Sequence, residues 1–285
     1  MLSFPNCKIN LGLNIICKRS DGYHDLETVF YPVQLKDALE IIRQPSIVNQ
    51  QPTTSNNQLP SVNFSSTGLT INGSQSDNLC IKAYQLLQQN FPDLVPSIKM
   101  QLHKVIPMGA GLGGGSADGA FALQLLNDKF HLKLTTEQLV NYALQLGSDC
   151  PFFILNKPCF ATSRGEVMQP INLDLSAYQI VIINPEIHIG TGWAFGNIIP
   201  QSPQKSIQQI IQQPIETWRE QLVNDFEKPA INQYPEIGKI KETLYQHGAV
   251  YSSMTGSGST VFGLFSKSKK LSFSFPKHYF VFFAT

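Results

Sequence analysis

The sequence predicts an α+β fold with two lobes. Segments of strand and helix periodicity are mixed along the chain without strict βα alternation, which favours α+β over doubly wound folds. Apolar residues make up 42% of the 285 residues, enough for a sizeable core. A dense glycine run lies between a predicted strand and a predicted helix. We place the boundary near residue 160, with an N-terminal lobe over 1–160 and a C-terminal lobe over 161–285.

The first lobe opens with extended segments. Apolar and polar residues alternate over 6–16, which predicts a half-buried strand with Lys8 and Asn10 on its polar face. A turn at 19–22 leads into a second extended segment at 23–30.

The next segments continue the mixture of strand and helix. A strand is predicted over 38–43, and the polar run over 44–61 is interpreted as a variable surface loop without chemistry. Asp77 or Asn78 can cap a helix over 79–89.

A strand over 97–106 precedes the glycine run, and an apolar helix follows the run to about residue 130. Thr135 and Gln138 predict a capping box for a helix over 135–146, with Gly147 as its stop. An apolar segment at 152–155 is interpreted as a strand.

The second lobe is predicted to begin with a buried strand over 180–184. Helices are predicted around 204–213 and 235–247, and a glycine-serine turn at 254–260 precedes a strand over 261–265.

Composition excludes several classes of function. The net charge is +1, from 21 basic and 20 acidic residues, so the chain lacks an electrostatic footprint for nucleic acid or an anionic membrane. The five cysteines form no CxxC pair and indicate small buried side chains rather than a metal or redox site. Without a signal peptide or a membrane-length apolar run, we expect a cytoplasmic protein, a monomer or weak homodimer.

The glycine run predicts a phosphate site. Five glycines occur between Gly109 and Gly115, where they allow left-handed backbone and close approach of a ligand, and the following helix offers unpaired N–H groups. The Walker A pattern fails because no Gly-Lys-Ser/Thr ends the run. The dinucleotide fingerprint is matched formally over 109–114, but no acidic residue ends a second strand about 20 residues later.

Three segments in order resemble the motifs of the GHMP kinase family. They are KINLGLNI at 8–15, PMGAGLGGGSAD at 107–118 and MTGSGSTVFGLF at 254–265. The resemblance implies a kinase that uses ATP and Mg²⁺, with an N-terminal lobe like the second domain of ribosomal protein S5 and a C-terminal ferredoxin-like lobe. The protein ligand of magnesium stays open, because Gly114 and Gly115 precede the first serine.

Two further segments, RSDGYHDLETVF at 19–30 and GSDCPFF at 147–153, are similar to members of the family that act on a cytidyl-erythritol substrate. This resemblance implies ATP-dependent phosphorylation of the 2-hydroxyl of the erythritol unit, in the non-mevalonate route to isoprenoid precursors.

The resemblance assigns roles to individual residues. Asp149 is the expected general base and Lys8 the catalytic cation, although by spacing alone Asp149 suits a helix-terminal carboxylate equally and Lys8 a snorkelling edge lysine. Asn10 is expected to bind substrate hydroxyls. The residues expected to hold ATP are Pro107, Met108, Gly109, Ala110, Gly111, Leu112, Gly113, Gly114, Gly115, Ser116 and Ala117, with Asn78 and Leu79 beside the adenine.

The cytidyl group is expected to meet aromatic side chains. Tyr23 can stack on the base and His24 can bond its edge. Thr191 and Phe195 match a second contacting segment, with a core role for Phe195 as the alternative.

Three rival functions stay open at this point. They are a GHMP kinase for homoserine, mevalonate or a sugar, a catalytically inactive ligand sensor, and a dinucleotide-dependent oxidoreductase.

Overall fold

The computed structural model describes residues 1–44 and 60–284, so the predicted loop at 44–61 lies mostly outside the described residues. The chain folds into two compact units that interleave along the sequence. The first unit contains Met1–Pro5, Lys36–Val105 and Gly115–Leu155, and the second contains Asn6–Leu35, Ile106–Gly114 and Asn156–Thr285. Residues 6–35 and 106–114 fold with the second half of the chain, so the two units are not separated by a single cut in the sequence. The lobe boundary near residue 160 stays a prediction.

The first unit has a four-stranded sheet of order β1-β4-β6-β5. Its strands are β1 (Leu2–Ser3), β4 (Ala38–Arg43), β6 (Ile98–Lys104) and β5 (Val62–Gly68). The β5–β6 pair is parallel and the other pairs are antiparallel. Alternate residues of β6 are buried, from Ile98 to Lys104, so the strand period places a lysine on the core face.

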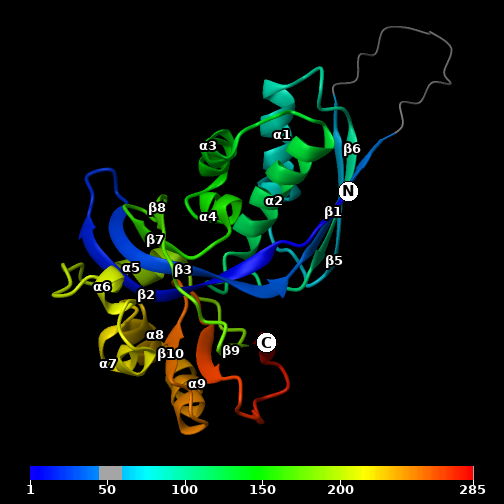
Figure 1. Ribbon diagram of the computed structural model, residues 1–285. Helices are drawn as coiled ribbons and strands as arrows, with labels where there is room; N and C mark the ends of the chain where they lie inside the picture. The colour runs from blue at the N-terminus through cyan, green and yellow to red at the C-terminus, as the bar shows by residue number, and fades with distance from the viewer. Residues whose placement is uncertain (45–59, 285) are drawn as a thin grey trace, which may run out of the picture. The chain divides into compact units, whose positions relative to one another are not determined.

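Four α-helices of this unit lie along one face of its sheet (Figure 1). They are α1 (Leu79–Asn90), α2 (Gly114–Lys129), α3 (Thr136–Leu146) and α4 (Cys150–Leu155), with a 3-10 turn, η1 (Gln75–Asp77), before α1. The predicted caps are confirmed, because the Asn78 side chain accepts from Cys80 N, and Thr135 and Gln138 form the capping box of α3.

The prediction of a strand over 152–155 was wrong, because Cys150–Leu155 forms helix α4. A short apolar run cannot be assigned by periodicity alone, since a buried strand and a buried helical turn look alike. Pro151 suits the first turn of a helix, where its missing N–H removes no hydrogen bond.

The second unit contains a sheet of order β2-β3-β7-β8. Its strands are β2 (Asn6–Lys18), β3 (His24–Lys36), β7 (Cys159–Thr162) and β8 (Val167–Pro170). The prediction that the first long strand is half-buried was wrong, because every residue of β2 from Asn6 to Ile15 is buried. Its polar side chains have partners inside the unit, since Asn10 Nδ2 donates to Thr28 Oγ1 and Asn14 Nδ2 donates to Glu27.

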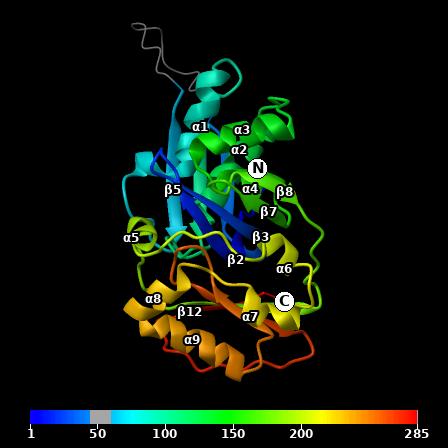
Figure 2. The ribbon, with the colours of Figure 1, turned by 90° about the vertical axis from the view of Figure 1, so that its left-hand side faces the viewer.

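The other sheet of this unit has the order β10-β11-β9-β12, and all its pairs are antiparallel. Its strands are β10 (Tyr251–Met254), β11 (Val261–Ser266), β9 (Tyr178–Asn184) and β12 (Phe280–Ala284). The helical elements are α5 (Thr191–Gly196), α6 (Ile207–Ile210), η2 (Ile215–Thr217), α7 (Trp218–Gln221), α8 (Glu227–Gln233) and α9 (Pro235–Gln246). Helices α8 and α9 lie beside this sheet (Figure 2).

The predicted helix around 204–213 is much shorter than expected, because only Ile207–Ile210 is helical. Ser206 caps its start, and its side chain accepts from Gln208 N. Pro214 follows shortly after, and the residue before a proline disfavours the helical region, so the helix cannot extend.

Candidate active site

The glycine-rich loop has the backbone that its sequence requires. Gly109, Gly111 and Gly113 have φ angles of +65°, +80° and +70°, a region that residues with a side chain rarely adopt. The loop leads directly into α2, so Gly114, Gly115, Ser116 and Ala117 form its first turn. The N–H groups of this turn have no partner within the helix. This arrangement fits a phosphate chain, because bare backbone and a helix N-terminus suit an anion.

The loop also packs against the second glycine-serine turn. A Cβ on Gly111 would lie 2.0 Å from the Thr255 carbonyl oxygen, and a Cβ on Gly258 would lie 2.3 Å from the carbonyl carbon of Ala110. The Thr255 hydroxyl donates to the Gly111 carbonyl at 3.2 Å. These glycines are therefore needed for close contact between two backbones, apart from any ligand.

Lys8 and Asn10 lie beside this pair of turns, within the second unit. Lys8 N donates to the Leu112 carbonyl at 2.9 Å, and Asn10 N donates to the Thr255 hydroxyl at 2.9 Å. The Lys8 ammonium donates to Asn10 Oδ1 at 2.6 Å and lies 5.0 Å from the ring centre of Phe30. Because Lys8 is only 4% exposed, the alternative of a snorkelling surface lysine is wrong.

Asp149 lies in the first unit, half-buried, directly before α4. Lys8 and Asn10 belong to the second unit, and the roles of Asp149 as general base and Lys8 as catalytic cation stay predictions. Asn78 caps α1, as its sequence position allows, and Leu79 packs closely on α2, because its Cβ would lie 2.7 Å from a Cβ on Gly119. A contact of Asn78 or Leu79 with adenine stays a prediction.

The residues expected at the cytidyl group lie in the second unit. Tyr23 is 54% exposed, and the His24 ring stacks on Phe195 at 4.7 Å between centres. Burial, with a smaller effect of the Lys18 charge, lowers the pKa of His24. Phe195 also packs against the hydrophobic core of this unit, through an edge contact with Phe226. The two expectations for Phe195, a ligand contact and a core role, are therefore compatible.

Thr191 begins α5, one helical turn before Phe195, and is exposed. The helix places the two side chains on the same face, since residues four apart are neighbours.

Sequence reasoning missed a buried ion-pair cluster in the first unit. The Lys104 ammonium contacts the carboxylates of Asp37 and Asp118, and Asp37 also accepts from Val105 N at 2.5 Å. The sequence contains one signal of this cluster, because Lys104 lies on the otherwise apolar face of the strand predicted over 97–106. The cluster connects β6, immediately before the glycine-rich loop, to α2, immediately after it.

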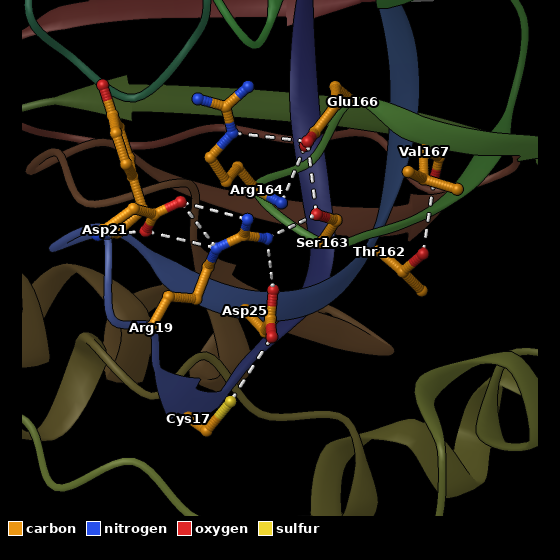
Figure 3. A network of polar contacts seen from close by, with 10 residues as sticks. Cys17, Arg19, Asp21, Asp25, Thr162, Ser163, Arg164, Glu166 and Val167 are labelled. Carbon is orange, nitrogen blue, oxygen red and sulfur yellow. Dashed lines mark hydrogen bonds and ion pairs between the residues drawn. The ribbon is translucent and has the colours of Figure 1, made fainter.

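Sequence reasoning also gave no role to Arg164. Its guanidinium lies over the Tyr23 ring, 4.8 Å from the ring centre. Figure 3 shows the polar network around it, in which Arg164 bonds Glu166 and Ser163 connects Glu166 to Arg19. The turn carrying Arg164 follows β7, a strand that was not predicted, so nothing in the sequence placed it next to Tyr23.

Among the described residues, no group of three or more His, Cys, Asp or Glu side chains could hold a metal ion. Cys7, Cys80, Cys150 and Cys159 are buried as expected, whereas Cys17 is exposed and bonds Asp25.

Comparison with known proteins decides the family. The chain matches the model of the GHMP kinases N terminal domain over residues 78–157 and that of the GHMP kinases C terminal over 206–275. It is 49% identical to a protein of Bacteroides fragilis named 4-diphosphocytidyl-2-C-methyl-D-erythritol kinase, over 95% of this chain and 94% of that one. The chain belongs to the GHMP kinase family. A relative of the same name from Azobacteroides pseudotrichonymphae is 46% identical over 99% of this chain and 100% of its own.

Solved structures of GHMP kinases have the same fold. A 4-(cytidine 5'-diphospho)-2C-methyl-D-erythritol kinase aligns with a TM-score of 0.75 and 28% identity, over 93% of this chain and 90% of that one. The homoserine kinase of Cytophaga hutchinsonii aligns with a TM-score of 0.66 at 13% identity, over 98% of this chain and 94% of that one. The predicted α+β GHMP kinase fold is therefore confirmed, and this GHMP kinase has no described helix long and apolar enough to cross a membrane.

Proposed function

We propose that this GHMP kinase phosphorylates the 2-hydroxyl of 4-diphosphocytidyl-2-C-methyl-D-erythritol with ATP, giving the 2-phosphate and ADP in the non-mevalonate isoprenoid pathway. The observation that carries the proposal is the 46–49% identity, over nearly the whole chain, to relatives named for this substrate. Likeness to the homoserine kinase rests on 13% identity and supports the fold alone.

The glycine-rich loop and the first turn of α2 would hold the phosphate chain of ATP. The cradle consists of the backbone of residues 107–117, with room at Gly109 for a Cβ, which would be in ordinary contact with His188 at 3.7 Å. ATP supplies the phosphoryl group. The backbone N–H groups of the loop and of the first turn of α2 would offset the negative charge of the phosphates. Magnesium would be held mainly by phosphate oxygens and water, because the described residues offer no acidic cluster.

Asp149 would act as the general base that accepts the proton of the substrate hydroxyl. Lys8 would supply positive charge at the reacting oxygens. The hydrogen bond from its ammonium to Asn10 and the buried surroundings restrict its rotamers, so the charge is held in place before the substrate binds. Asn10 would orient the hydroxyl groups of the erythritol unit.

Tyr23, His24, Thr191 and Phe195 would bind the cytidyl group. The Tyr23 ring is exposed enough to stack on a base, and the lowered pKa of His24 favours the neutral imidazole, which can both donate and accept a hydrogen bond. The stack of His24 on Phe195 fixes the orientation of the imidazole.

The test is a coupled ADP-release assay with ATP, magnesium and the cytidyl substrate, run beside mevalonate, homoserine and galactose. ADP release with the cytidyl substrate alone supports the proposal. Release with another alcohol would leave the family and the phosphate loop intact but overturn the cytidyl pocket. A folded protein that releases no ADP with any of them would favour a ligand sensor.

A further inference from the structure

The Tyr23 ring has a cation on one of its faces. The central carbon of the Arg164 guanidinium lies 4.8 Å from the ring centre, within the range of a cation–π contact. A planar guanidinium can lie flat on an aromatic ring, which a lysine ammonium cannot do. Tyr23 as a residue is still 54% exposed, so its side chain remains accessible to a ligand.

The guanidinium is held in place by its own turn. Glu166 accepts from Arg164 Nε at 3.3 Å and from Arg164 N at 2.7 Å. The Ser163 hydroxyl donates to the same carboxylate at 3.2 Å. The bond from Nε restricts the rotamers of Arg164, so less side-chain entropy is lost when it stacks on the ring, and the other two bonds hold Glu166 in position.

The turn that carries Tyr23 is fastened to the turn that carries Arg164. Asp21 accepts from Tyr23 N at 3.0 Å, and the Arg19 guanidinium donates to Asp21 and to the Ser163 hydroxyl. Leu26 N donates to the Ser163 carbonyl at 2.7 Å. Figure 3 shows the side chains of Arg19 and Ser163 joining the two turns. The two turns that carry the ring and the guanidinium are therefore held together, whereas the cation–π contact acts on the Tyr23 ring itself.

We propose that Arg164 is a positioning residue for the nucleotide substrate: its guanidinium holds the Tyr23 ring so that the uncovered face stacks on the pyrimidine base. This inference rests on the proposed function, and it adds a specificity-determining residue that acts through Tyr23. Removing the guanidinium frees the ring to rotate, so the base binds more weakly while the reacting groups are unchanged.

The test compares the KM for 4-diphosphocytidyl-2-C-methyl-D-erythritol, the KM for ATP and kcat in four proteins. They are the wild type, Arg164→Ala, Tyr23→Ala and the double variant. Arg164→Ala should raise the KM for the cytidyl substrate about two- to five-fold, the range for a partly exposed cation–π contact, with kcat and the KM for ATP unchanged. In the Tyr23→Ala background the same substitution should have no further effect. Arg164→Lys should raise the KM for the cytidyl substrate less than Arg164→Ala does.

Arg219 offers a matched control, because its guanidinium lies 4.2 Å from the ring centre of Tyr245 within the same unit, and neither residue has a role in the proposed site. Arg219→Ala should leave all three constants unchanged. An unchanged KM in Arg164→Ala, or an equal rise with and without Tyr23, would overturn the positioning role while the proposed function stands. A wild type that does not phosphorylate the cytidyl substrate would overturn the proposed function, and this role with it.

Discussion

The Lys104→Met substitution removes a buried cation that contacts the side chains of Asp37 and Asp118. The Lys104 and Asp37 side chains are fully buried and that of Asp118 is 4% exposed, and Lys104 Nζ lies 2.7 Å from Asp118 Oδ2. Asp118 Oδ1 has no hydrogen-bond partner within the part of the chain that the structure describes. Burial, opposed by the Lys104 charge and assisted by that of Asp37, raises the pKa of Asp118 to about 8.

The expected loss of folding stability follows from the additional proton that the folded variant must bind. Without Lys104, a further buried carboxyl has to be neutralised, which costs about 1.4 kcal/mol for each pH unit above its ordinary pKa of about 3.9. That is about 4 kcal/mol at pH 7, within the range of about 3–5 kcal/mol for removing one partner of a buried ion pair, and about 1.5 kcal/mol at pH 5. Because the folded variant binds a proton that the unfolded chain releases, its stability should fall as the pH rises between these values.

The assay is urea unfolding followed by circular dichroism, for wild type and variant, at pH 5 and pH 7. Lys99 lies on the exposed face of the same strand, β6, and Lys99→Met should change the free energy of unfolding by less than about 0.5 kcal/mol. A loss below about 1 kcal/mol in Lys104→Met at pH 7 would refute the cluster as a buried charge network. An equal loss at both pH values would refute its dependence on carboxylate ionisation.

Three further predictions concern the proposed site. Asp149→Asn should lower kcat at least about 100-fold with the Kd for ATP unchanged, and wild-type-like turnover would remove Asp149 as the base. His24→Ala should raise the KM for the cytidyl substrate about ten-fold. In the wild type this KM should rise only below about pH 6.5, because burial lowers the pKa of His24. A KM that does not change with pH would contradict a neutral imidazole as the ligand. Gly111→Ala should lower the free energy of unfolding by about 2 kcal/mol or more in thermal unfolding, since its Cβ would lie 2.0 Å from a carbonyl oxygen. Gly109→Ala should lower it by about 1 kcal/mol, through its left-handed backbone alone. Equal losses of stability in the two variants would contradict the backbone contact at Gly111.

Local features of the fold were predictable because they depend on neighbours in the sequence. The caps at Asn78 and Thr135, and the strand that begins at Asn6, follow from side-chain chemistry and period-2 alternation. Where a short apolar run has no such signal, as at Cys150–Leu155, the choice between strand and helix depends on tertiary packing, and the prediction was wrong.

The missed residues depend on contacts distant in sequence. Lys104 is paired with Asp37, 67 residues away, and Arg164 stacks on a tyrosine from the turn between β2 and β3. A lysine on a buried strand face indicates that a partner exists, because an unpaired buried charge is too costly, but it does not identify that partner. The sequence could therefore predict the backbone of the glycine-rich loop, which depends on glycines close together in the chain, and could not predict these two clusters.

Residues 8–15, 107–114 and 254–265 of the three family motifs are separated in the sequence but pack together in the second unit. Lys8 N donates to the Leu112 carbonyl, Asn10 N donates to the Thr255 hydroxyl, and Gly111 has no room for a Cβ against Thr255. Each motif thus supports the backbone of another, so a loss of activity in Gly111→Ala would reflect a distorted loop rather than a lost phosphate contact. Gly109 is the position that separates the two effects, because a Cβ there would meet no atom closer than 3.7 Å. If Gly109→Ala raises the KM for ATP while costing no more than about 1 kcal/mol of stability, the loop backbone itself approaches the phosphates.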